Sequence, residues 1–284
     1  MDKTIGLLGG GQLGQMLCEA AGPLGIKIIV LDAENSPAKQ VNARNAHIDG
    51  SFTDADKIRE LARQCDILTV EIEHVDTHVL EEIAEQGVDV VVDGRIVKKR
   101  VEVQPSWRTL RMIQDKYLQK RHLEENGVAV AESVAVEATA EALKNAGDKL
   151  GYPYMLKARK DSYDGRGNFP VKSHLDIIEA LEFLKGRQLY AEKWAEFKME
   201  LAVMVVKRAE EPGSFLYTSA YPTVETIHED SICKLVYAPA RRVSETLQRE
   251  AQKLARKAVS SLWGKGVFGV ELFLMEDGKI PLSL

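Results

Sequence analysis

Residues 154–168 read YMLKARKDSYDGRGN and carry the most informative pattern in the chain. The apolar run before Lys157 predicts a strand, and a loop containing Gly165 and Gly167 comes after it. A lysine at a strand end next to such a loop brings a cation and backbone N–H groups to one place, which suits a phosphate. Most single lysines after a strand are surface residues, so this interpretation needs support from residues further along the chain.

Three further groups occur in an order that supports a nucleotide. Glu192-Lys193-Trp194 ends a second predicted strand and suits a hinge that meets an adenine ring. Glu200 could accept a hydrogen bond from a ribose hydroxyl, and Glu271 could hold a metal. Each feature alone is more often structural, but the ordered set predicts a nucleotide held between two sheets.

The first third of the chain predicts a βαβ unit. Apolar residues 4–9 lead into Gly9-x-Gly11-x-x-Gly14, and residues 26–31 form a second predicted strand that ends at Asp32. This pattern satisfies the dinucleotide fingerprint, so a nicotinamide oxidoreductase is a competing hypothesis. From this motif alone, a nucleotide, another phosphate ligand and simple close packing are about equally well supported.

A third strand, 67–70, is predicted to end in Glu71-Ile72-Glu73, which completes a doubly wound α/β layer. Asp93-Gly94 lies between two β-branched runs and predicts a hairpin within 88–103. Pro105-Ser106-Trp107 marks a boundary between domains 1–106 and 107–284. Helices are expected from Thr53 to Ala62 and over 108–125, 139–150, 174–185 and 247–262.

Composition excludes several classes of protein. The chain has 284 residues and a formal net charge of −5, which gives no support for a nucleic-acid partner. Three widely spaced cysteines argue against a disulfide framework and for a reducing compartment. No apolar run approaches the ~20 residues of a membrane span, and no signal-peptide pattern opens the chain. We therefore expect a cytoplasmic protein without a membrane partner.

His74 and His78 lie four residues apart near two glutamates and could suggest zinc. The segment is predicted to lie at a strand end and has no further clear ligand set. Zinc binding is therefore the less favoured interpretation.

The chain resembles the N5-carboxyaminoimidazole ribonucleotide synthetase family of ATP-grasp enzymes, most closely its fungal form, phosphoribosylaminoimidazole carboxylase. The resemblance covers residues 4 to about 276 and implies an ATP-grasp fold preceded by a Rossmann-like pre-ATP-grasp domain. The segments that carry it are GLLGGGQLGQM, LDAENSPAKQ, TVEIEHVD, IQDKYLQK, YDGRGNF, YAEKWAEFKMELAVMVVK, TVETIHEDSICKLVYAPAR and GVFGVELF.

The resemblance implies ATP- and bicarbonate-dependent carboxylation of 5-aminoimidazole ribonucleotide in purine biosynthesis, with ATP and Mg²⁺ as cofactors and a homodimer as the assembly. It makes Lys157, Asp164 and Arg166 the candidate catalytic residues and Glu271 a magnesium ligand. The implied ribonucleotide contacts are Gln12, Leu13, Glu73, Tyr163, Asp164 and Arg166. The implied ATP contacts are Lys116, Lys157, Ser162, Tyr163, Asp164, Gly165, Arg166, Gly167, Asn168, Glu192, Lys193, Trp194, Glu200 and His228.

The end of the chain departs from the family pattern. Ser283 and Leu284 stand where the resemblance implies an asparagine and a second magnesium glutamate. We therefore expect an ATP-grasp domain without its closing strand and without the third domain or a fused carboxylase domain. Loss of one carboxylate at the metal would cost ~10²-fold in rate, so weak catalysis and a tendency to aggregate are expected.

Two segments, 89–103 and 209–220, are longer than the family pattern and are expected to be surface insertions. A related ligase, the formate-dependent glycinamide ribonucleotide transformylase, is the nearest enzymatic alternative, and YDGRGN argues against it. A non-catalytic nucleotide-binding protein is the alternative from another class.

Overall fold

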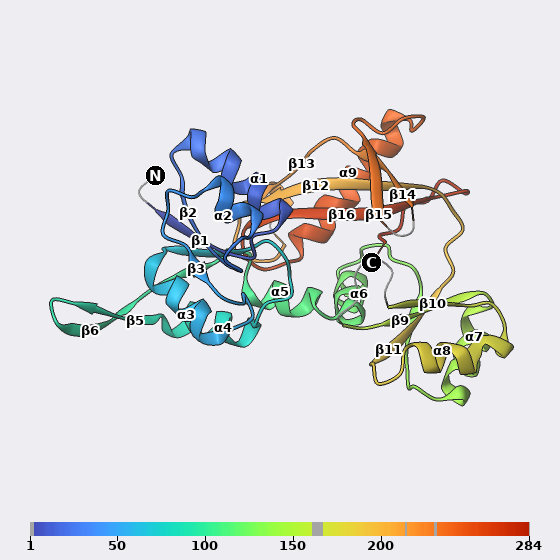
Figure 1. The fold of residues 1–284 in the computed structure, drawn as a ribbon. Helices are drawn as coiled ribbons and strands as arrows, with labels where there is room; N and C mark the ends of the chain where they lie inside the picture. The colour runs from blue at the N-terminus through green and yellow to red at the C-terminus, as the bar shows by residue number, and fades with distance from the viewer. Residues whose placement is uncertain (1–2, 161–166, 214, 230–231, 284) are drawn as a thin grey trace. The chain divides into compact units, whose positions relative to one another are not determined.

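The computed structural model describes residues 3–160, 167–213, 215–229 and 232–283 (Figure 1). The chain divides into two compact units. The first comprises residues 1–111 and 263–265, and the second comprises residues 112–262 and 266–284. The boundary predicted after residue 106 falls five residues before this division, because the helix that starts at Trp107 stays largely with the first unit.

The first unit is built on a five-stranded sheet in which every neighbouring pair is parallel, in the order β3-β2-β1-β4-β7. Its strands are β1 (Thr4–Leu8), β2 (Lys27–Asp32), β3 (Ile48–Asp49), β4 (Ile67–Val70) and β7 (Glu102–Val103). Its helices are α1 (Gln12–Ala21), η1 (Gly22–Leu24), α2 (Pro37–Val41), α3 (Ala55–Gln64), α4 (Thr77–Gln86) and α5 (Trp107–Ile113).

The doubly wound prediction is confirmed by the position of β1. Strand β1 pairs with β2 on one side and with β4 on the other, so the strand order reverses between β1 and β4. Ligands of such sheets bind outside the carboxyl ends of the strands at this point. The turn after β1 begins at Gly9, and Glu71 comes directly after β4, so both belong to this end of the sheet.

The predicted hairpin is also confirmed. Strands β5 (Val88–Val92) and β6 (Arg95–Lys99) form a separate two-stranded sheet that extends away from the rest of the first unit in Figure 1. Asp93 and Gly94 connect them with φ values of 50° and 73°. Positive φ at both central residues is what the tight hairpin turn requires, and Asp-Gly supplies it.

The second unit contains two antiparallel sheets. In the first sheet the order is β10-β9-β11-β8, and helices α7 and α8 bury one of its faces. The elements are β8 (Ser133–Val136), α7 (Ala140–Leu150), β9 (Tyr154–Ala158), β10 (Asn168–Val171), η2 (His174–Asp176), α8 (Ile177–Phe183) and β11 (Leu189–Lys193).

The second sheet has the order β13-β12-β14-β15, with β16 paired to the other edge of β12. Small residues of helix α9, including Ala251, Ala255 and Ala258, pack against one face. The elements are β12 (Phe197–Lys207), η3 (Phe215–Tyr217), β13 (Thr218–Ala220), β14 (Val224–Glu229), β15 (Ile232–Tyr237), α9 (Glu245–Ser260) and β16 (Gly266–Met275).

The single helix predicted over 108–125 is wrong, because α5 ends at Ile113 and α6 runs from Lys116 to Glu125. Asp115 sits at the break, and its carboxylate accepts a hydrogen bond from the N–H of Leu118 at the start of α6.

The predicted start of α3 is also corrected by one residue. Its N-cap is Asp54, not Thr53, because the Asp54 carboxylate accepts from the N–H groups of the second and third residues after it.

The expectation that the chain stops before a strand that returns along β16 also needs correction. After a turn at Gly278, residues 279–283 run back along β16. The N–H of Phe273 donates to the carbonyl of Pro281, and the N–H of Ser283 donates to the carbonyl of Glu271. These bonds cover the edge of β16 as far as Glu271.

Among the residues that the structure describes, no helix is both long and apolar enough to cross a membrane.

Replacing Gly6 by alanine should destabilise the protein by about 1–3 kcal/mol, because a Cβ there would overpack a filled core. That atom would lie 2.7 Å from the Cys65 Sγ and 2.9 Å from atoms of Leu61 and Leu68. Urea unfolding would measure the change. Gly22→Ala is the matched control, because no atom lies within 4 Å of its Cβ position. Equal effects from the two substitutions would contradict this account of the core.

Only Cys233 should react with a thiol reagent in the native protein at pH 8. Burial raises the pKa of the Cys65 thiol to about 12 and also raises the pKa of Cys18, whereas Cys233 is exposed. Because the thiolate is the nucleophile, the two buried thiols should react only on unfolding. Timed alkylation and mass spectrometry would check this, and Cys233→Ser should abolish the fast phase. Fast labelling of Cys65 would show that the first unit opens readily.

Candidate functional site

The first candidate region is the face of the β9–β11 sheet that turns away from α7 and α8. Side chains alternate along a strand, and Leu189 and Ala191 of β11 point into the core beneath those helices. Tyr190 and Glu192 therefore share the opposite face. Lys157 of β9 is the register partner of Tyr190, which places it on that face too.

Three charged side chains meet on this face. Glu192 accepts a short hydrogen bond from Lys120 of α6, and its second oxygen lies 3.5 Å from the Nζ of Lys157. All three side chains are at most 9% exposed. Isolated buried charges are very unfavourable, so each lysine helps to offset the desolvation of this carboxylate. Burial lowers the pKa of Lys120, while the Glu192 carboxylate acts in the opposite direction.

Lys120 is a site residue that the sequence reasoning missed. It lies four residues after Lys116 on α6, so the two lysines occupy the same side of the helix. That spacing within IQDKYLQK was the available signal. What it did not show is that Lys120 is fully buried and joins α6 to β11 through Glu192.

The start of α6 is fixed to the end of β9. Asp115 is buried and accepts from Arg159 through two guanidinium nitrogens, with a shortest distance of 2.6 Å. The N–H of Lys116 donates to the carbonyl of Arg159 at 2.8 Å. These bonds hold Lys116 at the end of the strand that carries Lys157.

The central part of the predicted phosphate loop lies outside the described residues, and with it Ser162, Tyr163, Asp164, Gly165 and Arg166. The last two residues of the motif are described. Gly167 accepts a hydrogen bond from the N–H of Ala158, and Asn168 is the register partner of Lys157. The chain therefore returns from the loop directly beside Lys157.

The second candidate region is the face of the β12–β16 sheet opposite α9. Leu201 and Leu272 belong to the core beneath α9, so the alternating residues Glu200 and Glu271 lie on the other face. The Nδ1 atom of His228 on β14 lies 2.6 Å from a carboxylate oxygen of Glu200. The structure thus brings together two residues that the sequence had assigned separately to the nucleotide site.

Glu271, predicted from the sequence to hold a metal, is exposed. Within the described part of the chain, His, Cys, Asp and Glu side chains form no group of three or more that could hold a metal ion. The zinc alternative for His74 and His78 therefore has no support there. An exposed carboxylate suits a hard cation such as Mg²⁺, which usually binds through one or two carboxylates together with phosphate oxygens.

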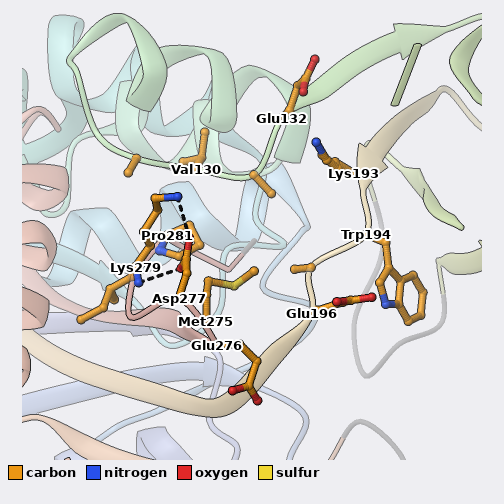
Figure 2. Close-up of a pocket in the computed structure, with 14 residues that line it drawn as sticks. Val130, Glu132, Lys193, Trp194, Glu196, Met275, Glu276, Asp277, Lys279 and Pro281 are labelled. Carbon is orange, nitrogen blue, oxygen red and sulfur yellow. Dashed lines mark hydrogen bonds and ion pairs between the residues drawn. The ribbon is translucent and has the colours of Figure 1, made fainter. Parts of the chain in front are cut away.

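A pocket of about 640 Å³ opens at the end of β11, where the chain passes between the two sheets of the second unit (Figure 2). Lys193 and Trp194, both predicted to contact the nucleotide, line it, and Met275 lines its opposite side. Its apolar surface is well suited to a flat ring, and charged residues stand around it. The remaining lining residues are 129–132, 195–196, 276–277 and 279–281.

In the first unit, Glu71 occupies the glycine turn. Its carboxylate accepts from the N–H of Gly11 at 2.5 Å and from the N–H of Leu13 at 3.0 Å. A Cβ on Gly11 would lie 2.8 Å from a Glu71 oxygen, so the glycine is needed for this close approach. Of the three interpretations left open for the motif, close packing accounts for these contacts.

The same turn argues against the nicotinamide alternative. In dinucleotide-binding folds the acidic residue after the second strand binds ribose, and the turn receives the pyrophosphate. Here Asp32 accepts the N–H of Gly10 at 2.6 Å, and Glu71 places a negative charge where the pyrophosphate would lie. Gln12 and Leu13, predicted near the substrate phosphate, begin α1 beside this carboxylate. Glu73 lies two residues after Glu71.

The sequence matches two domain families in series. Residues 1–114 match the ribonucleotide synthetase preATP-grasp domain, and residues 121–283 match the ATP-grasp domain. Phosphoribosylaminoimidazole carboxylase of Candida albicans is 54% identical over 283 residues, covering 99% of this chain and 47% of the relative. N5-carboxyaminoimidazole ribonucleotide synthase of Bacillus subtilis is 32% identical, covering 99% of this chain and 68% of the relative.

A crystal structure of N5-carboxyaminoimidazole synthase from Aspergillus clavatus, in complex with ADP and 5-aminoimidazole ribonucleotide, is also similar. It superposes with a TM-score of 0.88 at 53% identity and covers 99% of this chain and 68% of that one. The chain belongs to the N5-carboxyaminoimidazole ribonucleotide synthase family of ATP-grasp proteins. Family membership confirms the resemblance and the predicted ATP-grasp fold. The chain spans about half the length of the Candida albicans family member.

Lys120→Met should lower the free energy of unfolding by about 3–5 kcal/mol, because it removes one partner of a buried carboxylate. Urea unfolding would measure the loss. In the Lys120→Met/Glu192→Gln double variant much of the loss should be recovered, giving a coupling energy of about 1 kcal/mol or more between the two sites. Strictly additive effects would show that the Lys120–Glu192 contact contributes no net stability.

Proposed function

We propose that the chain provides the ATP-dependent part of an enzyme that carboxylates 5-aminoimidazole ribonucleotide to N5-carboxyaminoimidazole ribonucleotide in purine biosynthesis. The observation that carries the proposal is the buried Lys120–Glu192–Lys157 cluster at the end of β9, beside the returning end of a glycine loop. The chain's family membership supplies the reaction.

The reaction has two steps. Bicarbonate oxygen attacks the γ-phosphorus of ATP, the bond to the β-phosphate oxygen breaks, and carboxyphosphate and ADP form. The exocyclic amine of the ribonucleotide then attacks the carboxyl carbon, phosphate leaves and the amine loses a proton. Phosphoryl transfer depends mainly on positioning and charge neutralisation. Lysines in fixed positions are therefore what the site must supply.

ATP phosphates are proposed to lie against Lys157 and Lys116. Glu192 keeps the Nζ of Lys157 in place, and the Asp115–Arg159 pair fixes the start of α6. A charged side chain that is already in position needs no reorganisation during the reaction. This preorganisation is the main source of electrostatic catalysis. Asp164 and Arg166, which lie outside the described residues, are proposed as catalytic groups.

The adenine ring is proposed to enter by the pocket at the end of β11, between Trp194 and Met275. Because the Glu192 carboxylate is already engaged by two lysines, its role at the nucleotide is to orient Lys157. Glu200 is proposed to accept a ribose hydroxyl, with His228 orienting its carboxylate from 2.6 Å.

Glu271 is proposed to hold Mg²⁺, which neutralises phosphate charge when bound. The ribonucleotide is proposed to contact Gln12, Leu13, Glu73, Tyr163, Asp164 and Arg166. We also propose that bicarbonate is the co-substrate, that the protein is a homodimer and that it is located in the cytoplasm. The three free cysteines are consistent with a reducing compartment and support the proposed location.

Lys157→Gln should weaken ATP binding about tenfold or more, because a charge-assisted contact to phosphate is lost. Calorimetric titration with ATP and Mg²⁺ would measure it. Lys172→Gln is the matched control, because Lys172 is an exposed lysine directly after β10 of the same sheet. Circular dichroism would confirm that both variants fold. Unchanged ATP affinity in Lys157→Gln would refute the nucleotide site.

Release of ADP should require bicarbonate and 5-aminoimidazole ribonucleotide together. A coupled assay would compare this pair with formate and glycinamide ribonucleotide. Turnover with the second pair would instead support the transformylase alternative. Saturable ATP binding without turnover under either condition would support a non-catalytic binding protein.

A further inference from the structure

A polar hollow of about 570 Å³ lies on the second unit, where one end of β13 meets α9. Both elements are labelled in Figure 1. None of its lining residues belongs to the proposed nucleotide or substrate site. They are Leu216, Thr218, Ser219, Ala220, Arg249, Gln252, Lys253 and Arg256.

Three cations come to this hollow from one side of α9. Arg249, Lys253 and Arg256 are spaced four and three residues apart, so they lie in one row along the helix. None of the lining residues is acidic. Outside the lining, Glu245 pairs with Arg249 at 2.8 Å. The hollow therefore carries a net positive charge in a chain whose formal net charge is −5.

Arg256, the last of the three cations along α9, is fixed by several contacts. Its Nε donates to the Thr218 hydroxyl at 3.3 Å, and one terminal nitrogen donates to the carbonyl of Phe215 at 3.1 Å. Its guanidinium also stacks over the Phe215 ring at 4.1 Å. A guanidinium has five N–H donors, and these bonds use two of them. A fixed guanidinium with further donors costs little entropy when an anion binds.

The opposite wall comes from a segment that the proposed function leaves unexplained. The sequence predicts a surface insertion over residues 209–220, and the last part of this segment forms η3 and β13. On this wall the Thr218 hydroxyl accepts from Arg256 and donates to the carbonyl of Phe215 at 2.7 Å, so it helps to fix the guanidinium. This segment therefore forms one wall of the hollow, and the three cations of α9 line the other wall.

We propose that this hollow is a second anion site, which binds the phosphate groups of a small molecule carrying a di- or triphosphate. Three cations in one row and an amide at Gln252 match the dense charge of linked phosphates better than that of a single carboxylate. The volume is that of a small-ligand pocket. The site is separate from the nucleotide-binding lysines, so it is independent of the proposed reaction.

Pyrophosphate is the probe for the test, in the full chain carrying Lys157→Gln so that binding at the nucleotide site is weakened. Calorimetric titration should show one saturable site that weakens at higher salt. Adding Lys253→Gln or Arg249→Gln should weaken binding about tenfold. Lys234→Gln removes an exposed cation from β15, away from the hollow, and should leave binding unchanged.

Equal loss from Lys234→Gln and Lys253→Gln, or no saturable binding, would overturn the proposal. With Lys157 intact, Lys253→Gln should weaken only the ATP-binding step at the hollow and leave the step lost in Lys157→Gln unchanged. Titration of the Lys157→Gln protein with ADP and with ribose 5-phosphate identifies the ligand class. Binding of ADP and pyrophosphate but not of the monophosphate is the expected result, and preference for the monophosphate would contradict a di- or triphosphate ligand.

Discussion

The buried Glu192 carboxylate is the constraint on which the nucleotide region of the second unit depends. A carboxylate with this little exposure must be paired, and it takes Lys120 from α6 and Lys157 from β9. One residue of β11 therefore ties together a helix and two strands. The same contacts that offset its desolvation also fix Lys157, the lysine proposed to bind phosphate, so stability and the proposed function depend on one cluster.

A second carboxylate organises the first unit in a comparable way. Glu71 lies at the end of β4 and binds the backbone of the turn after β1. The two strands are neighbours in the sheet, at the point where strand order reverses. In both units a glutamate at a strand end accepts from hydrogen-bond donors of the kind that bind phosphate. Glu71 accepts from backbone N–H groups of the glycine turn, and Glu192 pairs with two lysines. A glycine fingerprint alone therefore does not establish a nucleotide site.

The segment 209–220, which the sequence predicts to be a surface insertion, lines the hollow beside α9 with its last residues. Its last residues form β13, which pairs with β12, and the buried Thr218 lies against Arg256 of α9. Edge strands must be covered or charged to avoid unwanted pairing. The row of cations on α9 lies beside this edge and gives it a polar, positively charged border.

Local patterns were sufficient to predict the parallel layer, the hairpin at Asp93-Gly94 and the strand that carries Lys157, because spacing and turn chemistry act over a few residues. They missed the break before α6 and the burial of Lys120. The break depends on Asp115 binding Arg159, 44 residues away, and the burial depends on Glu192, 72 residues away. Pairing of distant charges is decided only when the chain packs, since desolvation exists only in the folded interior.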